Sequence, residues 1–141
     1  MQADKEKMPS SRLIIFLKNP VAGRVKTRLA ADIGAERALD VYIALLKHTL
    51  LEASKFYKQY TAERTAVALY FSDAVPARKN FPLAIPEDFR LFQQHGEGLG
   101  TRMKNAFKDG FDASFTHQVI IGSDCPQLAA LHLQQAFDAL S

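Results

Sequence analysis

Short runs of apolar residues that lack polar alternation are the feature that most limits how this chain can fold. Residues 13–17 read LIIFL and residues 65–71 read TAVALYF. A strand with one face in water alternates apolar and polar residues, whereas a strand buried on both faces does not. Strands of the second kind belong to parallel sheets covered by helices. These two runs therefore predict an α/β fold.

The segments around these runs give the order strand, helix, strand, loop, strand, helix, strand, helix. We expect strands also at residues 90–94, as an edge strand, and at residues 118–122. This order favours a three-layer, Rossmann-like fold with a mostly parallel sheet and helices on both faces. Helices are expected at residues 27–33, 34–56 and 99–111 and from Pro126 through Leu131 and Phe137 to the last residues. Tyr42 should pack beside the apolar stripe of the second helix. The side chains expected to face inward are Leu39, Ile43, Leu46, Leu50, Met103, Phe107 and Phe111.

Size and composition are those of one soluble globular domain, with 141 residues, 48% hydrophobic and 23% charged. We expect a flexible tail at residues 1–11 and a single nucleotide-binding domain at residues 12–141. The tail has no apolar segment of the kind that a secretory signal needs, and no stretch is long enough to cross a membrane. One cysteine, Cys125, rules out an internal disulfide. Together these features favour a cytoplasmic protein.

The excess of positive charge lies largely between residues 18 and 28, in a loop that follows the first predicted strand. In an open α/β sheet, ligands bind beyond the carboxyl ends of the strands, so this loop is placed to bind an anion. The net charge of +3 is small, which suits a local phosphate ligand better than a nucleic acid. The alternative is a solvated basic loop without function. The candidate phosphate-binding residues are Lys18, Gly23, Arg24, Lys26, Thr27 and Arg28.

Three glycines at alternate positions, Gly96, Gly98 and Gly100, predict a turn that leads into the helix carrying Arg102. The turn follows the third strand and should lie at the same edge of the sheet as the basic loop. Glycine lets a ligand approach the backbone closely, although a flexible loop without function would also be rich in glycine.

Asp124 follows the fourth predicted strand and should face the same crevice. As a helix cap it would bind backbone N–H groups. As a metal ligand it would hold Mg²⁺ or Mn²⁺ together with substrate phosphates. The sequence leaves both alternatives open. Cys125 is expected to be a small buried residue rather than a nucleophile, because no His–Asp pair is visible to activate it.

The histidines are expected to be surface residues. His48 has no second His or Cys at metal-ligand spacing, which argues against a metal site there. His95 and His117 are of the right type to act as general bases, but ordinary surface histidines are far more common.

Three segments in order, KNPVAGRVKTRL, GEGLGTRMKNAF and IIGSDCPQL, resemble a family of bacterial glycosyltransferase-like proteins, the DUF2064 type, related to phospholactate guanylyltransferase. The resemblance runs from about residue 13 to residue 140. It implies the GT-A fold of the nucleotide-diphospho-sugar transferases. Proteins of this fold normally continue past the last predicted helix, so the C-terminal part of the fold, which holds the acceptor, is expected to be missing.

The resemblance also implies roles for individual residues. Lys18, Gly23 and the segment 26–28 correspond to the loop that receives the nucleotide phosphates, and the turn at residues 98–102 lies by the base and ribose. Asp124 matches the metal-binding acid. Relatives usually carry acids where this chain has Glu97 and Thr101. The implied catalytic groups are Lys26, Arg28 and Asp124, with Mg²⁺ or Mn²⁺ as the cofactor.

Three functional hypotheses follow. The first is a transferase that takes a glycosyl or nucleotidyl group from a nucleotide or nucleotide-sugar and passes it to an unknown acceptor. The second is a nucleotide-binding module without turnover, or a fragment of a larger transferase. The third is a chain that forms homo-oligomers by pairing an exposed sheet edge with another copy. Nucleic acid and membrane partners are not expected.

Overall fold

The computed structural model describes residues 9–60 and 64–141. The predicted tail at residues 1–11 therefore lies mostly outside the described residues, and its last residue already belongs to the first strand. The elements along the chain are β1 (Ser11–Leu17), α2 (Thr27–Ile33), α3 (Ala35–Gln59), β2 (Thr65–Phe71), η1 (Arg78–Asn80), β3 (Arg90–Gln93), α4 (Leu99–Asp112), β4 (His117–Ile121) and α5 (Ala130–Leu140).

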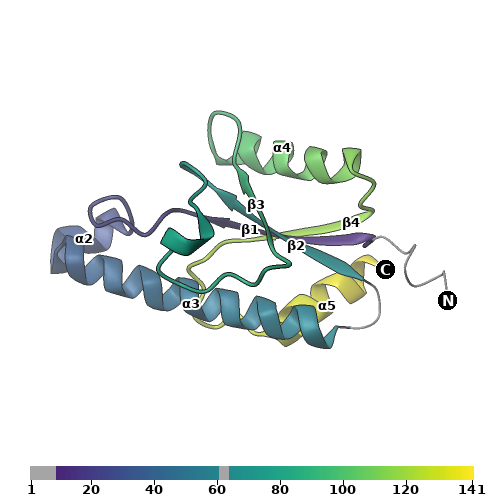
Figure 1. The fold of residues 1–141 in the computed structure, drawn as a ribbon, viewed down its shortest axis with the longest axis horizontal. Coiled ribbons are helices and arrows are strands. Elements are labelled where there is room, and N and C mark those ends of the chain that lie inside the picture. The colour runs from purple at the N-terminus through teal and green to yellow at the C-terminus, as the bar shows by residue number, and fades with distance from the viewer. Residues whose placement is uncertain (1–8, 61–63) are drawn as a thin grey trace.

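The four strands form one parallel sheet in the order β3-β2-β1-β4. In Figure 1, α3 and α5 lie on one side of the sheet and α4 on the other. The predicted three-layer α/β fold is confirmed, and the strand at residues 90–93 is an edge strand as expected. All seven residues of β1 are buried because β1 lies between two strands and between two layers of helices.

The larger core lies between the sheet and the pair α3 and α5. Leu13, Ile15 and Leu17 of β1 point into it, and Phe56 of α3 stacks on Phe137 of α5 with ring centroids 5.4 Å apart. At the start of α3, Ala38 and Tyr42 are buried while Leu39 and Ile43 are half-buried, so the most buried stripe is rotated from the predicted one, although Tyr42 packs as expected. The side chains of Leu46 and Leu50 are buried as predicted.

The smaller core, on the α4 side of the sheet, contains a buried arginine. Arg12 is 5% exposed and donates from Nε to Gln118 Oε1 (3.1 Å) and from Nη2 to the Ala106 carbonyl (2.7 Å). Its guanidinium also lies 5.3 Å from the centre of the Tyr70 ring. Gly110 permits this arrangement, because a Cβ atom there would overlap the Gln118 side chain.

One predicted inward position is wrong, since Phe111 of α4 is 55% exposed. Phe111 stacks instead on Phe107 along the helix surface, with centroids 6.4 Å apart. In α5 the buried residues are Ala130, Leu133 and Phe137. A helical pattern gives the spacing of a buried face but not its rotation, which the packing of the helix against the rest of the fold sets.

None of the helices that the structure describes is long and apolar enough to cross a bilayer.

Candidate functional site

A cavity of about 440 Å³ opens at the carboxyl ends of the strands. The chain crosses from β3 on one side of β1 to β4 on the other, so the strand order reverses between β1 and β4. Parallel α/β sheets bind ligands in the crevice at such a reversal, because the loops on its two sides diverge. The cavity is lined by Phe16, Leu17, Lys18, Val25, Lys26, Tyr42, Ser72, Gln94, Gly98, Leu99, Arg102, Gly122, Ser123 and Asp124.

The structure brings together half of the candidate residues named from the sequence. Lys18 and Lys26 come from the loop after β1, Gly98 and Arg102 from the start of α4, and Asp124 from the loop after β4, and all five line this cavity. The remaining five candidates are exposed and do not line it. They are Gly23, Arg24, Thr27, Arg28 and Gly100, and their role in binding phosphate stays a prediction.

Arg102 is held in place by neutral groups. Its Nε donates to the Gly96 carbonyl (2.9 Å), and its Nη1 donates to the Ser72 carbonyl (3.3 Å) and to Gln94 Oε1 (3.2 Å). Gln94 is 8% exposed and is itself fixed, because its Nε2 donates to the Tyr70 carbonyl (2.9 Å). These contacts orient the guanidinium without neutralising its charge.

The cavity carries uncompensated positive charge. Among residues 9–60 and 64–141, the ion pairs are Lys55–Glu52 and Lys108–Asp112, and neither includes Lys18, Lys26 or Arg102. Lys26 also has a left-handed backbone conformation (φ 49°), which is uncommon outside glycine and asparagine. Cations that lack a carboxylate partner at a crevice favour an anionic ligand.

Asp124 is exposed at the edge of the cavity and does not cap the following helix. The helix α5 has Ala129 as its N-cap and begins at Ala130, not at Pro126 as predicted. Of the two alternatives for Asp124, the helix cap is therefore wrong. Its neighbour Cys125 is exposed, which corrects the prediction that it is buried.

Asp124 is the one carboxylate among the described residues that line the cavity. Among the described residues, no three His, Cys, Asp or Glu side chains are close enough together to form a metal site. Mg²⁺ keeps several waters and is commonly bound through one or two carboxylates plus substrate phosphates. Asp124 at the edge of a cationic cavity can supply one such carboxylate.

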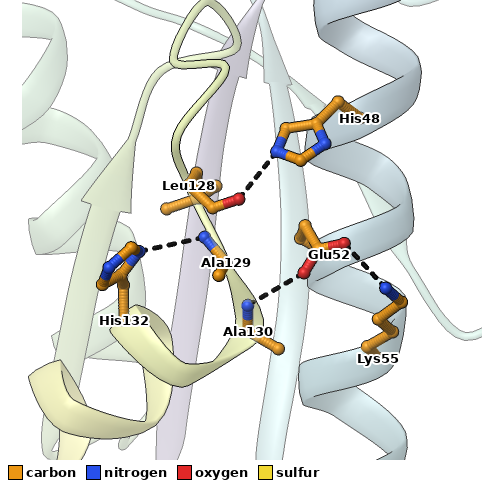
Figure 2. Close-up of polar contacts among 7 residues, drawn as sticks. All are labelled: His48, Glu52, Lys55, Leu128, Ala129, Ala130 and His132. Carbon is orange, nitrogen blue, oxygen red and sulfur yellow. Dashed lines mark hydrogen bonds and ion pairs between the residues drawn. The ribbon is translucent and has the colours of Figure 1, made fainter.

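Two side chains of α3, His48 and Glu52, bind the segment that leads from Asp124 into α5. Figure 2 shows both side chains pointing toward this segment. His48 Nε2 lies 2.7 Å from the Leu128 carbonyl, and Glu52 Oε1 accepts a hydrogen bond from the Ala130 N–H (3.1 Å). Glu52 thus binds the first N–H of α5, where a helix favours negative charge. His48 is half-buried by this contact rather than a free surface residue as predicted.

The Glu52 contact predicts a dependence of stability on pH. Hydrogen bonds from Lys55 and from the Ala130 N–H hold the pKa of the Glu52 carboxyl below its usual value. Its contribution to stability is therefore complete above the ordinary glutamate pKa and disappears as the pH falls through the lowered pKa. At pH 7 the free energy of unfolding of the unmodified chain should exceed that of Glu52→Gln by less than about 1 kcal/mol, because Lys55 is exposed and solvent screens the pair. Urea unfolding at pH 3 to 7 measures this, and a difference that did not shrink toward pH 3 would contradict it.

Sequence reasoning missed four polar side chains of the cavity, Tyr42, Ser72, Gln94 and Ser123. Tyr42 was assigned only a packing role in α3, yet its hydroxyl contacts both main-chain polar groups of Lys18, each at 2.8 Å. A buried tyrosine usually places its hydroxyl on a hydrogen-bond partner, so its position in the buried stripe was the available signal. For Gln94, the signal was an amide at the end of a strand that leads into the crevice.

Comparison with known proteins agrees with the α/β fold. A solved structure from Desulfovibrio desulfuricans G20, provisionally described as a nucleotide-diphospho-sugar transferase, superposes with a TM-score of 0.72 at 27% sequence identity. The match covers 94% of this chain and 55% of that one, so this chain spans about half the length of that protein. No curated protein matches the chain. The model of a family described as an uncharacterized protein conserved in bacteria (DUF2064) matches residues 55–141, more than half of the chain. The chain therefore belongs to the bacterial DUF2064 family.

Proposed function

We propose that this chain binds the phosphates of a nucleotide or nucleotide-sugar in the cavity, together with Mg²⁺ or Mn²⁺, and acts in glycosyl or nucleotidyl transfer. One observation carries the proposal. Lys18, Lys26 and Arg102, none of them paired with a carboxylate among the described residues, line the same cavity as Asp124. The Desulfovibrio structure is provisionally described as a nucleotide-diphospho-sugar transferase, which adds support for a sugar nucleotide as the donor.

The chemistry requires little covalent participation from the protein. In glycosyl transfer, the acceptor oxygen bonds to the anomeric carbon as the bond to the nucleoside diphosphate breaks. In nucleotidyl transfer, it bonds to the α-phosphorus as pyrophosphate leaves. Both reactions place growing negative charge on phosphate oxygens. Fixed cations directed at that charge stabilise the transition state.

Each residue has a proposed part. Lys26 and Arg102 bind the phosphates next to the reacting centre, Lys18 binds a more distant phosphate, and Arg28, in the first turn of α2, adds positive charge nearby. Asp124 would hold the metal ion, which when bound supplies further positive charge to the leaving phosphate. The uncapped N-terminus of α4 at Gly98 adds backbone N–H groups directed at the same region.

Calorimetry tests the proposal. The unmodified chain is titrated with a UDP-sugar, GTP and CTP, each with and without Mg²⁺. We expect at least one of them to bind, more tightly with Mg²⁺ present. Detection of released pyrophosphate or nucleoside diphosphate then separates a transferase from a binding module without turnover. Absence of binding by all three at millimolar concentration would contradict the proposal.

A lysine variant tests whether binding occurs in this cavity. Lys26→Met keeps the length of the side chain and removes its charge, and we expect about 10- to 100-fold weaker binding, the effect of one charged hydrogen bond to phosphate. Lys47→Met is the matched control, because Lys47 is exposed on α3 and does not line the cavity. Equal affinities of the two variants would place the ligand elsewhere.

A further inference from the structure

The hydroxyl group of Tyr42 joins the two sides of the cavity. Tyr42 is 5% exposed, with its ring in the core beneath the sheet. The hydroxyl accepts a hydrogen bond from the Lys18 N–H and donates one to the Lys18 carbonyl, both at 2.8 Å. It also lies 3.5 Å from the Ser123 hydroxyl, which donates to it. A phenolic oxygen has one proton and two lone pairs, so these three contacts use its full capacity.

The pairing between β1 and β4 ends before it reaches Lys18 and Ser123. The ladder between β1 and β4 ends at the pair Ile15–Ile121, and β1 continues beside β2 alone. Lys18 and Ser123 both lie past that last pair, where the two chain segments diverge. The Tyr42 hydroxyl reaches both of them at the point where the ladder no longer sets their separation.

Burial keeps the Tyr42 hydroxyl protonated, so that it can donate a hydrogen bond. Removal from water raises the pKa of Tyr42. The hydrogen bonds to Ser123 and Lys18 oppose part of this rise, and the smaller effects of the Asp73 and Asp124 charges add to it. Tyr42 therefore remains neutral at physiological pH and cannot serve as a general base there. Its part is to hold its neighbours in position.

We infer that Tyr42 is a positioning residue that sets the distance between Lys18 and Asp124 across the cavity. Lys18 bears one of the phosphate-binding charges, and Asp124 immediately follows Ser123. A nucleotide bound through Lys18 and a metal bound through Asp124 must share one geometry, because the metal also contacts the phosphates. Loss of the hydroxyl should therefore weaken the metal-dependent part of nucleotide binding. This consequence for nucleotides rests on the proposed function.

Tyr42→Phe tests the inference, since it keeps the ring in the core and removes only the hydroxyl. In amide NMR spectra without any ligand, hydrogen exchange at Lys18 should become about tenfold faster, because its N–H loses its partner, and the signals of residues 122–125 should shift. With nucleotide, the gain in affinity given by Mg²⁺ should fall about tenfold. Tyr60→Phe is the control, because the Tyr60 hydroxyl donates to Asp138 away from the cavity.

The outcomes separate the two proposals. A role confined to stability would lower the melting temperature of Tyr42→Phe and leave the Mg²⁺ effect unchanged, which would overturn the inference while the proposed function stands. If the unmodified chain bound no nucleotide, the proposed function would fail. The positioning role would then be upheld by faster exchange at Lys18 together with shifts at residues 122–125, and overturned by their absence.

Discussion

Replacing Asp124 with asparagine is expected to remove most of the effect of Mg²⁺ on nucleotide binding and to slow transfer about 100- to 1000-fold, the usual result of deleting one electrostatic partner of the transition state. Asparagine keeps the shape of the side chain and loses its charge, so it cannot replace the carboxylate that the metal prefers. The fold should be unaffected, because Asp124 is exposed and caps no helix.

The measurement is nucleotide affinity with and without Mg²⁺, followed by product release under saturating nucleotide. Asp112→Asn is the matched control, because Asp112 is also an exposed carboxylate but pairs with Lys108 on α4 and does not line the cavity. Identical metal dependence in Asp124→Asn and the unmodified chain would exclude Asp124 as a metal ligand. The cationic cavity would then have to bind phosphate without it.

Replacing Phe137 with alanine is expected to destabilise the fold by about 3–5 kcal/mol, the range found when a buried aromatic ring is deleted. Phe137 is fully buried in α5, stacked on Phe56 and 6.2 Å from the ring centroid of Tyr60. Small domains are stable by only about 5–15 kcal/mol, so this single change removes a large share of the total.

Urea unfolding followed by circular dichroism measures the loss. Leu140→Ala, in the same helix, is the control, because Leu140 is 46% exposed and its truncation should change stability by no more than about 0.5 kcal/mol. Equal losses in the two variants would show that the contact between α3 and α5 contributes little. Amide exchange in Phe137→Ala should increase first in α5, the element that loses its main anchor.

The fold could be predicted because its signals are local. Each buried strand is a continuous apolar run, and the order of the elements determines a parallel sheet. The start of α5 could not be predicted in the same way. Pro126 is a favourable first residue of a helix, but His48 and Glu52 bind the segment at the Leu128 carbonyl and the Ala130 N–H, so the helix starts later. That information lies in another helix, distant in sequence.

The candidate site was predictable to a similar extent and for a similar reason. Charged residues that follow strands gather at one edge of a parallel sheet, which correctly placed Lys26 and Asp124 at the same cavity. The rule does not say which residues between 18 and 28 line the cavity, so Arg24 and Arg28 could not be separated from Lys18. It also does not find Tyr42, which belongs to α3 and reaches the cavity from the core between that helix and the sheet.

The pairing of β1 with β4 has a consequence for how the cavity forms. The side chains of Arg12 and Gln118, which join β1 to β4, are 106 positions apart, so all of the chain between them must be synthesised before they can meet. Until β4 docks, Asp124 does not lie opposite the loop with Lys26, so a nascent or partly folded chain would lack the nucleotide site proposed above. A ligand that needs both sides should in turn slow the detachment of β4, making nucleotide protection against proteolysis a direct measure of that last docking step.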